Sequence, residues 1–452
     1  MSASQSPRDP GPLDLLSTLL DRARAAGADA ADALLFDSAS LSVSWRLGRL
    51  EDVERSENRD LGLRVFFGKS QASASSTRTD AAALEALVDR VVAMAKAAPP
   101  DPYCGLADPA LLEASPRDLD LHDPVEPEAE ALIARAAAAE DAARAVAGIT
   151  NSEGAGASWG ESRVAMMTSH GFAQTYRASS HSVSVSVVAG EGTGMERDYD
   201  YSSARHGGDL EDPAEIGASA GRRAVERLNP AKVGTSKVPV IFDPRVSSSL
   251  VGHFVGAISG AAIARGTSFL KDSLGKAVFA PGVSIVDDPH RKRGLRSRPF
   301  DGEGVRTAER KLIDDGVLTT WLLDSAAARQ LGLVSTGHAS RGTSGPPGPA
   351  PANLYMAPGK VSREDLIGDV AEGFYVTELI GMGVNGVTGD YSRGAAGFWI
   401  EKGRLARPVS ELTIAGNLRD MFRSLIPADD LVFRRGTDAP TIRVDGMTVA
   451  GR

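Results

Sequence analysis

The segment from residue 182 to residue 187, Ser-Val-Ser-Val-Ser-Val, constrains the fold more than any other local pattern in the chain. Successive side chains of a β-strand point to opposite faces, so this alternation predicts a strand with one buried and one solvated face. Apolar residues also recur at helical spacing in residues 13–27, 80–98, 128–148 and 213–228. Together these patterns predict helices packed on one face of a sheet, which is an α+β fold.

A polar stretch at residues 229–237 predicts a domain boundary. It contains Pro230 and Gly234 and separates the predicted helix at 213–228 from an apolar strand. We therefore predict two domains, an N-terminal α+β domain over residues 1–230 and a C-terminal, mostly β domain over residues 231–452.

The predicted second domain has short apolar segments, and Gly and Pro recur every few residues. Its predicted helices lie at residues 245–263, 325–332 and 362–373. The remaining residues predict strands joined by long loops, of which 341–355 is the longest. Because long ordered loops in compact domains often have a function, we expect this one to be a lid or a binding surface.

Charge and cysteine content exclude several classes of protein. A net charge of −9 argues against a nucleic-acid partner, which requires a concentrated basic face. Cys104 is the single cysteine, so neither an intramolecular disulfide nor a cysteine-based zinc cluster can form. No secretory signal and no apolar run of 18 residues are present. We therefore expect a cytoplasmic protein without a membrane partner.

The glycines at positions 381, 383 and 386 match the G-x-G-x-x-G spacing of dinucleotide-binding loops. That loop binds pyrophosphate only when a helix follows it directly. Here residues 387–394 are rich in glycine and poor in helix formers, and a strand-like segment comes next. The glycines therefore indicate backbone bending in a sheet-rich region and not a nucleotide site.

Two groups of residues are candidate metal ligands. Asp287, Asp288 and His290 could bind a metal together with Asp301 and Glu303, although the same residue types are common in turns.

His253 is the second candidate, in an otherwise apolar helix. A zinc site there would need a second ligand one turn further on and a carboxylate to polarise water. Phe254, Ala257 and Ile258 occupy the neighbouring positions.

Several blocks in the second region resemble the PmbA/TldE family, the paralogue and partner of the TldD metallopeptidases, whose members are also labelled modulators of DNA gyrase. The resemblance runs over most of the chain. The strongest blocks are VPVIFDP, AISGAAIARGTSFL, SIVDDP, RSRPFDGEGV, LLDSAAARQLG, STGHASRG, GVNGVTGDYSRGAAGFWIEKG and PVSELTIAGNLRDM.

In the TldD branch, the resemblance implies a zinc ion bound to an H-E-x-x-x-H helix and to a cysteine of the C-terminal domain. Only His253 has a counterpart in that motif, because Phe254 replaces the glutamate and Ile258 the second histidine. The cysteine has no counterpart either, since Cys104 lies in the first region. We therefore expect no catalytic residue and no metal or other cofactor in this chain, and zinc in a TldD-like partner.

The resemblance implies a non-catalytic, TldE-like subunit of a cytoplasmic TldD/TldE complex that degrades or matures peptides. Such a heterodimer would enclose a chamber for an unfolded or extended peptide, which an exposed strand edge could bind by β-augmentation. Asn385, Thr388, Asp390 and Ser392 are candidates for the chamber wall or the partner contact, and they could equally stabilise a turn.

Two alternative functions remain open. The chain could be a homodimeric regulatory or binding protein without a protease partner, acting through protein contacts and not through DNA. It could also be an enzyme with a metal site at Asp287, Asp288 and His290.

Overall fold

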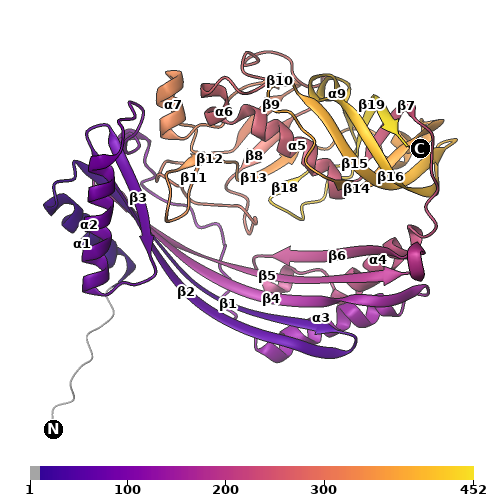
Figure 1. The fold of residues 1–452 in the computed structure, drawn as a ribbon, viewed down its shortest axis with the longest axis horizontal. Helices are drawn as coiled ribbons and strands as arrows, with labels where there is room; N and C mark the ends of the chain where they lie inside the picture. The colour runs from indigo at the N-terminus through magenta and orange to yellow at the C-terminus, as the bar shows by residue number, and fades with distance from the viewer. Residues whose placement is uncertain (1–10, 452) are drawn as a thin grey trace, which may run out of the picture.

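Six antiparallel strands form the N-terminal sheet, in the order β3-β2-β1-β4-β5-β6. The computed structural model describes residues 11–451. The strands are β1 (Ala30–Arg46), β2 (Arg49–Phe67), β3 (Ser70–Ser76), β4 (Ile149–Thr168), β5 (Ala173–Ala189) and β6 (Glu196–Ala204). Figure 1 shows that this sheet is long and curved, with its concave face toward the C-terminal part of the chain.

Strands of this sheet are longer than the sequence patterns predicted. The apolar and alternating segments at 32–38 and 41–46 read as two separate strands in the sequence, but both belong to β1, which pairs with β2 and β4. The first half of β2 is charged and exposed, so it has no apolar alternation to indicate a strand. Strand pairing with β1 holds this segment in the sheet.

Four helices cover the outer face of the sheet, as predicted: α1 (Pro12–Ala25), α2 (Ala81–Ala97), α3 (Ala129–Arg144) and α4 (Pro213–Glu226). One cluster joins α1 and α2 to the first half of β1, and a second joins α3 and α4 to β5. Val183, Val185 and Val187 are buried in the second cluster, which confirms the face assigned to them by the alternation. Helices α3 and α4 approach so closely that a Cβ at Gly217 would overlap the carbonyl of Ala139.

The C-terminal part is built around a closed β-barrel. Its strands run in the order β16-β15-β14-β7-β19, and pairing between β16 and β19 closes the ring. These strands are β7 (Ser236–Phe242), β14 (Glu372–Ile380), β15 (Asp390–Glu401), β16 (Arg404–Asn417) and β19 (Ile442–Ala450), with the short β17 (Ile426–Pro427) beside β19. β7 and β14 are parallel, and the other pairs in the ring are antiparallel.

A second, smaller sheet lies next to the barrel, in the order β10-β9-β8-β13-β18. Its strands are β8 (Ile285–Asp288), β9 (Arg310–Asp314), β10 (Val317–Leu318), β13 (Asn353–Met356) and β18 (Thr437–Asp438), and β11 (Ala339–Ser340) pairs separately with β12 (Gly348–Pro349). The helices of this part are α5 (Pro244–Ile258), α6 (Gly260–Ala264), α7 (Ser325–Leu331), α8 (Arg363–Gly368) and α9 (Leu418–Ser424). The C-terminal part is therefore mostly β with long loops, as expected.

The helix predicted at 245–263 is interrupted and forms α5 and α6. Ser259 has an extended backbone, with a ψ of 122°, and forms a bridge with Leu322. Gly260 donates a backbone hydrogen bond to Leu322 at 2.8 Å, and there is no room for a Cβ at this glycine beside Leu323. The prediction of one continuous helix was wrong because this contact comes from a distant segment.

The loop predicted at 341–355 packs against the N-terminal sheet. Arg341 donates to Asp32 of β1 at 2.5 Å, and Thr343 bonds to Asp60 of β2. A Cβ at Gly62 would overlap the backbone of Thr343. These contacts identify the first residues of the loop as an anchor between the two parts.

Within residues 11–451, none of the helices is both long enough and apolar enough to cross a membrane.

Candidate functional site

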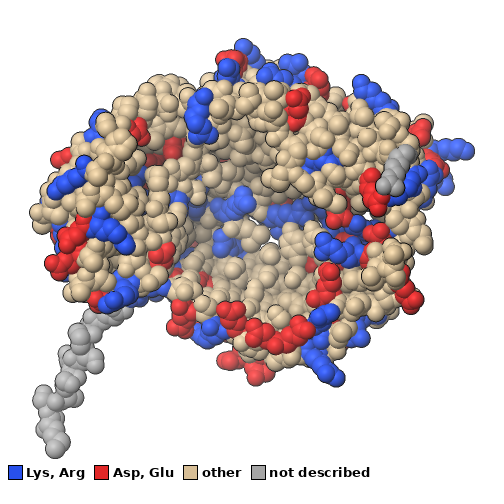
Figure 2. All heavy atoms as spheres, in the orientation of Figure 1, with Lys and Arg blue, Asp and Glu red and all other residues tan. Residues whose placement is uncertain are grey.

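A hollow lies between the concave face of the N-terminal sheet and the C-terminal part, with Lys and Arg side chains gathered at its wall (Figure 2). A cleft of about 1010 Å³ lies where β6 and α4 meet the C-terminal part. Its lining includes Asp198 and Arg227 from the N-terminal part and Arg245, Arg434 and Arg435 from the C-terminal part. The two halves of the chain therefore form this space together.

The middle strands of the sheet, β1, β4 and β5, present small polar residues to the hollow. Adjacent strands place Ser42, Ser158 and Ser182 in one row, and the hydroxyl groups of the last two lie 2.8 Å apart. Further residues of this face are Ser38, Ser40, Ser44, Gly156, Gly160, Ser180, Ser184 and Ser186. The solvated face predicted from residues 182–187 is thus one stripe of a wide serine-rich and glycine-rich surface.

Side chains occupy part of the outer edge of β6. Asp198 and Asp200 accept hydrogen bonds from the backbone N–H groups of Tyr199 and Tyr201, at 2.7 and 2.9 Å. The carbonyl of Tyr199 accepts from Arg245 at 3.2 Å. Because these backbone groups already have partners, an added peptide strand cannot pair here without displacing the side chains.

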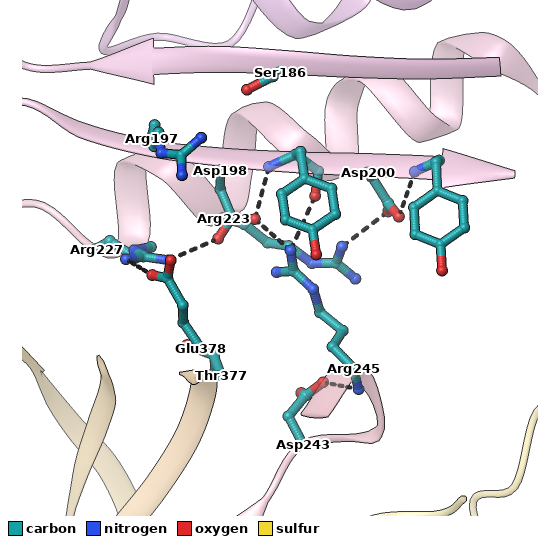
Figure 3. A network of polar contacts seen from close by, with 12 residues as sticks. Ser186, Arg197, Asp198, Asp200, Arg223, Arg227, Asp243, Arg245, Thr377 and Glu378 are labelled. Atoms are coloured by element: carbon teal, nitrogen blue, oxygen red, sulfur yellow. Dashed lines mark hydrogen bonds and ion pairs between the residues drawn. The ribbon is translucent and has the colours of Figure 1, made fainter. Parts of the chain in front are cut away.

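Charged residues of β6, α4, α5 and β14 form one network across the two parts (Figure 3). Asp198 lies 2.7 Å from Arg245 and 3.5 Å from Arg227, which also contacts Glu378. Burial by itself lowers the pKa of Arg245, but the hydrogen bond and charge of Asp198 outweigh it and raise this pKa. The network holds the start of α5 against the edge of the N-terminal sheet.

Helix α5 carries His253 on its partly open side. The helix begins after Asp243, whose side chain accepts from the N–H of Arg245 at 2.9 Å, with Pro244 in its first turn. The ring of His253 lies edge-on to Tyr391, with 5.9 Å between centroids. In the part of the chain that the structure describes, its Nε2 atom has no hydrogen-bond partner. Burial, and secondarily the charge of Arg393, lowers the pKa of His253, so this imidazole is neutral at pH 7.

The residues around His253 do not fit a zinc ion. Phe254 and Ile258 are fully buried, and Phe254 packs against Phe279 with 5.2 Å between ring centroids. These two side chains therefore contribute to the core of the C-terminal part. In the described chain, residues 11–451, no three or more His, Cys, Asp or Glu side chains gather so that they could hold a metal.

The other predicted metal ligands have separate partners. Asp287 is buried against His338, with 3.2 Å between Oδ2 and Nε2. Asp288 accepts from the N–H of His290 at 2.8 Å, and the His290 ring contacts Thr307 at 2.9 Å. The structure thus uses Asp287 in a buried contact with His338 and Asp288 in the local turn.

Asp301 and Glu303 are both buried. Asp301 accepts backbone hydrogen bonds from Glu303, Val305 and Ala339 at 2.8 to 3.0 Å. Burial, and next the charge of Glu303, raises the pKa of Asp301 to about 7. Because it accepts three backbone hydrogen bonds, this carboxyl group organises the loop around it.

The four polar residues predicted for a chamber wall lie in the β14–β15 connection and in the first residues of β15, and all are exposed. Asn385 accepts from the backbone of Thr388 at 3.3 Å, and the Thr388 hydroxyl donates to Asp390 at 2.6 Å. Ser392 follows in β15, and its N–H donates to the carbonyl of Gly383 at 2.7 Å. The side chains of Asn385, Thr388 and Asp390 thus stabilise the turn, and Ser392 contributes through its backbone. A contact of these residues with substrate or partner stays a prediction.

Sequence reasoning missed Tyr391, Arg393 and the charged residues of β6. The signal that could have found them is the alternation of polar residues in the segments 390–393 and 198–201. Such short alternations indicate a strand but do not identify the residues on the facing element.

The architecture, a curved helix-covered sheet facing a closed barrel, is that of a metallopeptidase family. Three family models match the chain: PmbA/TldA metallopeptidase domain 1 over residues 31–95, the central domain over residues 122–228 and the C-terminal domain over residues 235–451. Together they span most of the sequence. The chain therefore belongs to the PmbA/TldA metallopeptidase family, which confirms the resemblance to PmbA and TldE.

Related proteins match over nearly the whole length. The chain is 41% identical to metalloprotease PmbA of Escherichia coli O157:H7, over 97% of this chain and 96% of that protein. It is 38% identical to a metalloprotease PmbA homolog of Haemophilus influenzae, over 96% of this chain and 95% of that protein.

Solved structures share the fold. A Bacteroides thetaiotaomicron protein named as a candidate modulator of DNA gyrase is 28% identical with a TM-score of 0.89, over 97% of this chain and 98% of that one. TldE of Thermococcus kodakarensis is 21% identical with a TM-score of 0.86, over 97% and 100% of the two chains. At that identity the second match supports the fold alone.

Proposed function

We propose that this chain is the non-catalytic subunit of a cytoplasmic two-subunit zinc peptidase. Its partner would be a TldD-like relative that carries the H-E-x-x-x-H motif and the zinc ion. One observation carries the proposal: in a metallopeptidase-family chain, the positions after His253 hold Phe254 and Ile258, both buried in the core. Without a second ligand and a general base, this helix cannot activate water.

The hollow supports a role in receiving a peptide. Its floor is formed by serine and glycine residues, which leave room for an extended chain and offer hydroxyl groups as hydrogen-bond partners. Arginine side chains from the C-terminal part line the cleft beside β6, the edge strand of the same sheet. A surface of this kind can accept a peptide without selecting one sequence, because few of its contacts depend on the peptide's side chains.

The test compares the chain alone with the chain plus its zinc-binding relative. Zinc content is measured by mass spectrometry, and cleavage is followed with an unstructured fluorogenic peptide. We expect less than stoichiometric zinc and no cleavage for this chain alone, and cleavage when the relative is added. The matched control is the relative with the glutamate of its motif changed to glutamine, which should abolish cleavage in the mixture.

Two outcomes would contradict the proposal. Stoichiometric zinc with robust cleavage by the isolated chain would make it an enzyme in its own right. A stable homodimer that does not bind the relative would instead favour a regulatory or binding protein, the role that the name of the Bacteroides structure suggests.

A further inference from the structure

Three polar atoms beside helix α5 are buried and have no hydrogen-bond partner among residues 11–451. They are Nε2 of His253, Oη of Tyr391 and Nε of Arg393. Tyr391 is only 1% exposed, so its hydroxyl group cannot be satisfied by bulk water. Buried polar groups nearly always have partners in folded proteins, so one bound polar group that reaches these three atoms would complete their hydrogen bonds.

The fold explains why these residues meet. Tyr391 and Arg393 are two positions apart on β15, so their side chains lie on one face of the strand. The ring of His253 contacts the ring of Tyr391 from α5, with 5.9 Å between centroids. The charge of Arg393 acts on both neighbours: it adds to burial in lowering the pKa of His253 and opposes burial in the case of Tyr391.

Arg393 supplies the charge of this cluster. It forms no ion pair with an Asp or Glu side chain of residues 11–451, although it is half-buried. Burial raises the pKa of Tyr391 and lowers that of His253, so both rings are neutral at pH 7. The cluster thus has one positive charge, two side chains that donate hydrogen bonds, Arg393 and Tyr391, and a neutral imidazole.

Open space lies next to the cluster on α5. Gly252 and Gly256 flank His253 on the exposed side of the helix, and a Cβ at either position would have no atom within 4 Å. Residues four apart share one helix face, so the two glycines form a continuous bare surface. The backbone of a ligand can therefore approach the helix closely beside His253.

We propose that Arg393, Tyr391 and His253 form a binding site for a carboxylate group of an extended peptide. A guanidinium group binds a carboxylate through two parallel hydrogen bonds, and the tyrosine hydroxyl can donate a third. A single negative charge also balances the single positive charge of the cluster. The preference for a carboxylate rests on these side chains, whereas its attachment to a peptide rests on the proposed function above.

The test measures binding to the isolated, full-length chain by fluorescence anisotropy. The probes are two pairs of labelled, unstructured peptides. The first pair has no acidic residue and ends in either a free carboxylate or an amide. Both members of the second pair end in an amide, and they differ in one internal residue, Glu or Gln. We expect the carboxylate-bearing member of at least one pair to bind about tenfold to a hundredfold more tightly, as a charge-assisted hydrogen bond provides. The first pair reports a terminal carboxylate and the second an acidic side chain.

Variants locate the effect in the cluster. Arg393→Gln should remove the difference in affinity between the carboxylate-bearing peptide and its uncharged counterpart. Tyr391→Phe, which keeps the shape of the ring, should reduce this difference several-fold. The matched control is Arg404→Gln on β16, an exposed arginine with the same charge, which should leave it unchanged. If Arg393→Gln fails to fold by circular dichroism, Tyr391→Phe still provides the test.

Equal binding of acid and amide in both pairs would overturn the site, and so would a carboxylate preference that survives both variants. If the mixture of the two subunits does not cleave the peptide but this chain still binds carboxylate-bearing peptides more tightly, the proposed function is wrong and the carboxylate site is retained. The two proposals therefore fail separately.

Discussion

Replacing Arg245 by alanine tests whether the charged network of Figure 3 holds the two parts together. The Arg245 side chain is 13% exposed and that of Asp198 is 2% exposed, so the pair is largely removed from water. The guanidinium group also lies 4.7 Å from the ring centroid of Tyr199. Alanine removes these contacts but keeps the backbone N–H that Asp243 caps at the start of α5.

The structure gives a magnitude for this change. Breaking a buried ion pair by removing one partner costs about 3–5 kcal/mol, because the other charge stays buried. Asp198 would keep Arg227 at 3.5 Å, which lowers the expected cost to about 2–4 kcal/mol of unfolding free energy. In combination with Asp198→Asn, the effects should be non-additive by about 1–3 kcal/mol, since the two side chains contact each other.

Urea unfolding followed by tryptophan fluorescence measures these quantities. Trp45 and Trp159 report on the N-terminal part, and Trp321 and Trp399 report on the C-terminal part. Arg407→Ala is the matched control, because its pair with Glu401 is about half exposed and should contribute less than about 1 kcal/mol. A loss for Arg245→Ala no larger than that of the control, or additive effects with Asp198→Asn, would refute the role assigned to the network.

Three further predictions concern pH, glycine packing and the zinc motif. Because the folded pKa of Asp301 is about 7 and that of Glu303 is also raised, folding takes up protons above pH 4. This contribution to stability is therefore complete near pH 4 and is lost as pH rises to about 7, by up to about 1.4 kcal/mol per pH unit and proton. Urea unfolding at pH 5 to 8 should show that the free energy of unfolding falls less with rising pH in Glu303→Gln than in the unchanged protein. An equal fall in both proteins would contradict the raised pKa assigned to this pair. Gly217→Ala should lower the unfolding free energy by about 1–3 kcal/mol, because the methyl group overlaps Ala139, whereas Gly252→Ala, in open space on α5, should raise it by about 0.5–1 kcal/mol. Changes of equal sign and size in the two glycine variants would show that helix packing is not the cause. The double variant Phe254→Glu, Ile258→His should lose at least about 3 kcal/mol and bind no zinc by mass spectrometry, since both positions are buried; a stable, zinc-loaded variant would show that the helix can turn these positions outward.

Much of the fold could be predicted from local patterns. The serine and valine alternation in β5 assigned the correct faces, and the helical spacing located α1 to α4. The helix at 245–263 was predicted too long because serine and glycine at 259 and 260 do not end a helix by themselves. The long charged half of β2 was missed because exposed residues show no apolar period.

Some features of the candidate site could likewise be read from the sequence, and others needed the tertiary structure. The residue types that follow His253 can be read from the sequence, where Phe254 and Ile258 stand at the glutamate and second histidine positions of H-E-x-x-x-H. The cluster with Tyr391 and Arg393 is not visible, since it joins α5 to a strand far away in the chain. The same holds for Asp198 and Arg245, whose pairing depends on how the two parts dock.

By itself, the sequence determined the alternation of solvated and buried faces, the helical segments and the residue types that follow His253 on α5. These properties follow from neighbouring residues, through the periods of helices and strands and the chemistry of each side chain. Tertiary structure alone decided that Arg393 pairs with no Asp or Glu side chain of residues 11–451 and that the edge of β6 is covered by Asp and Arg side chains. Those outcomes depend on which distant segments pack together, and no local period records that choice.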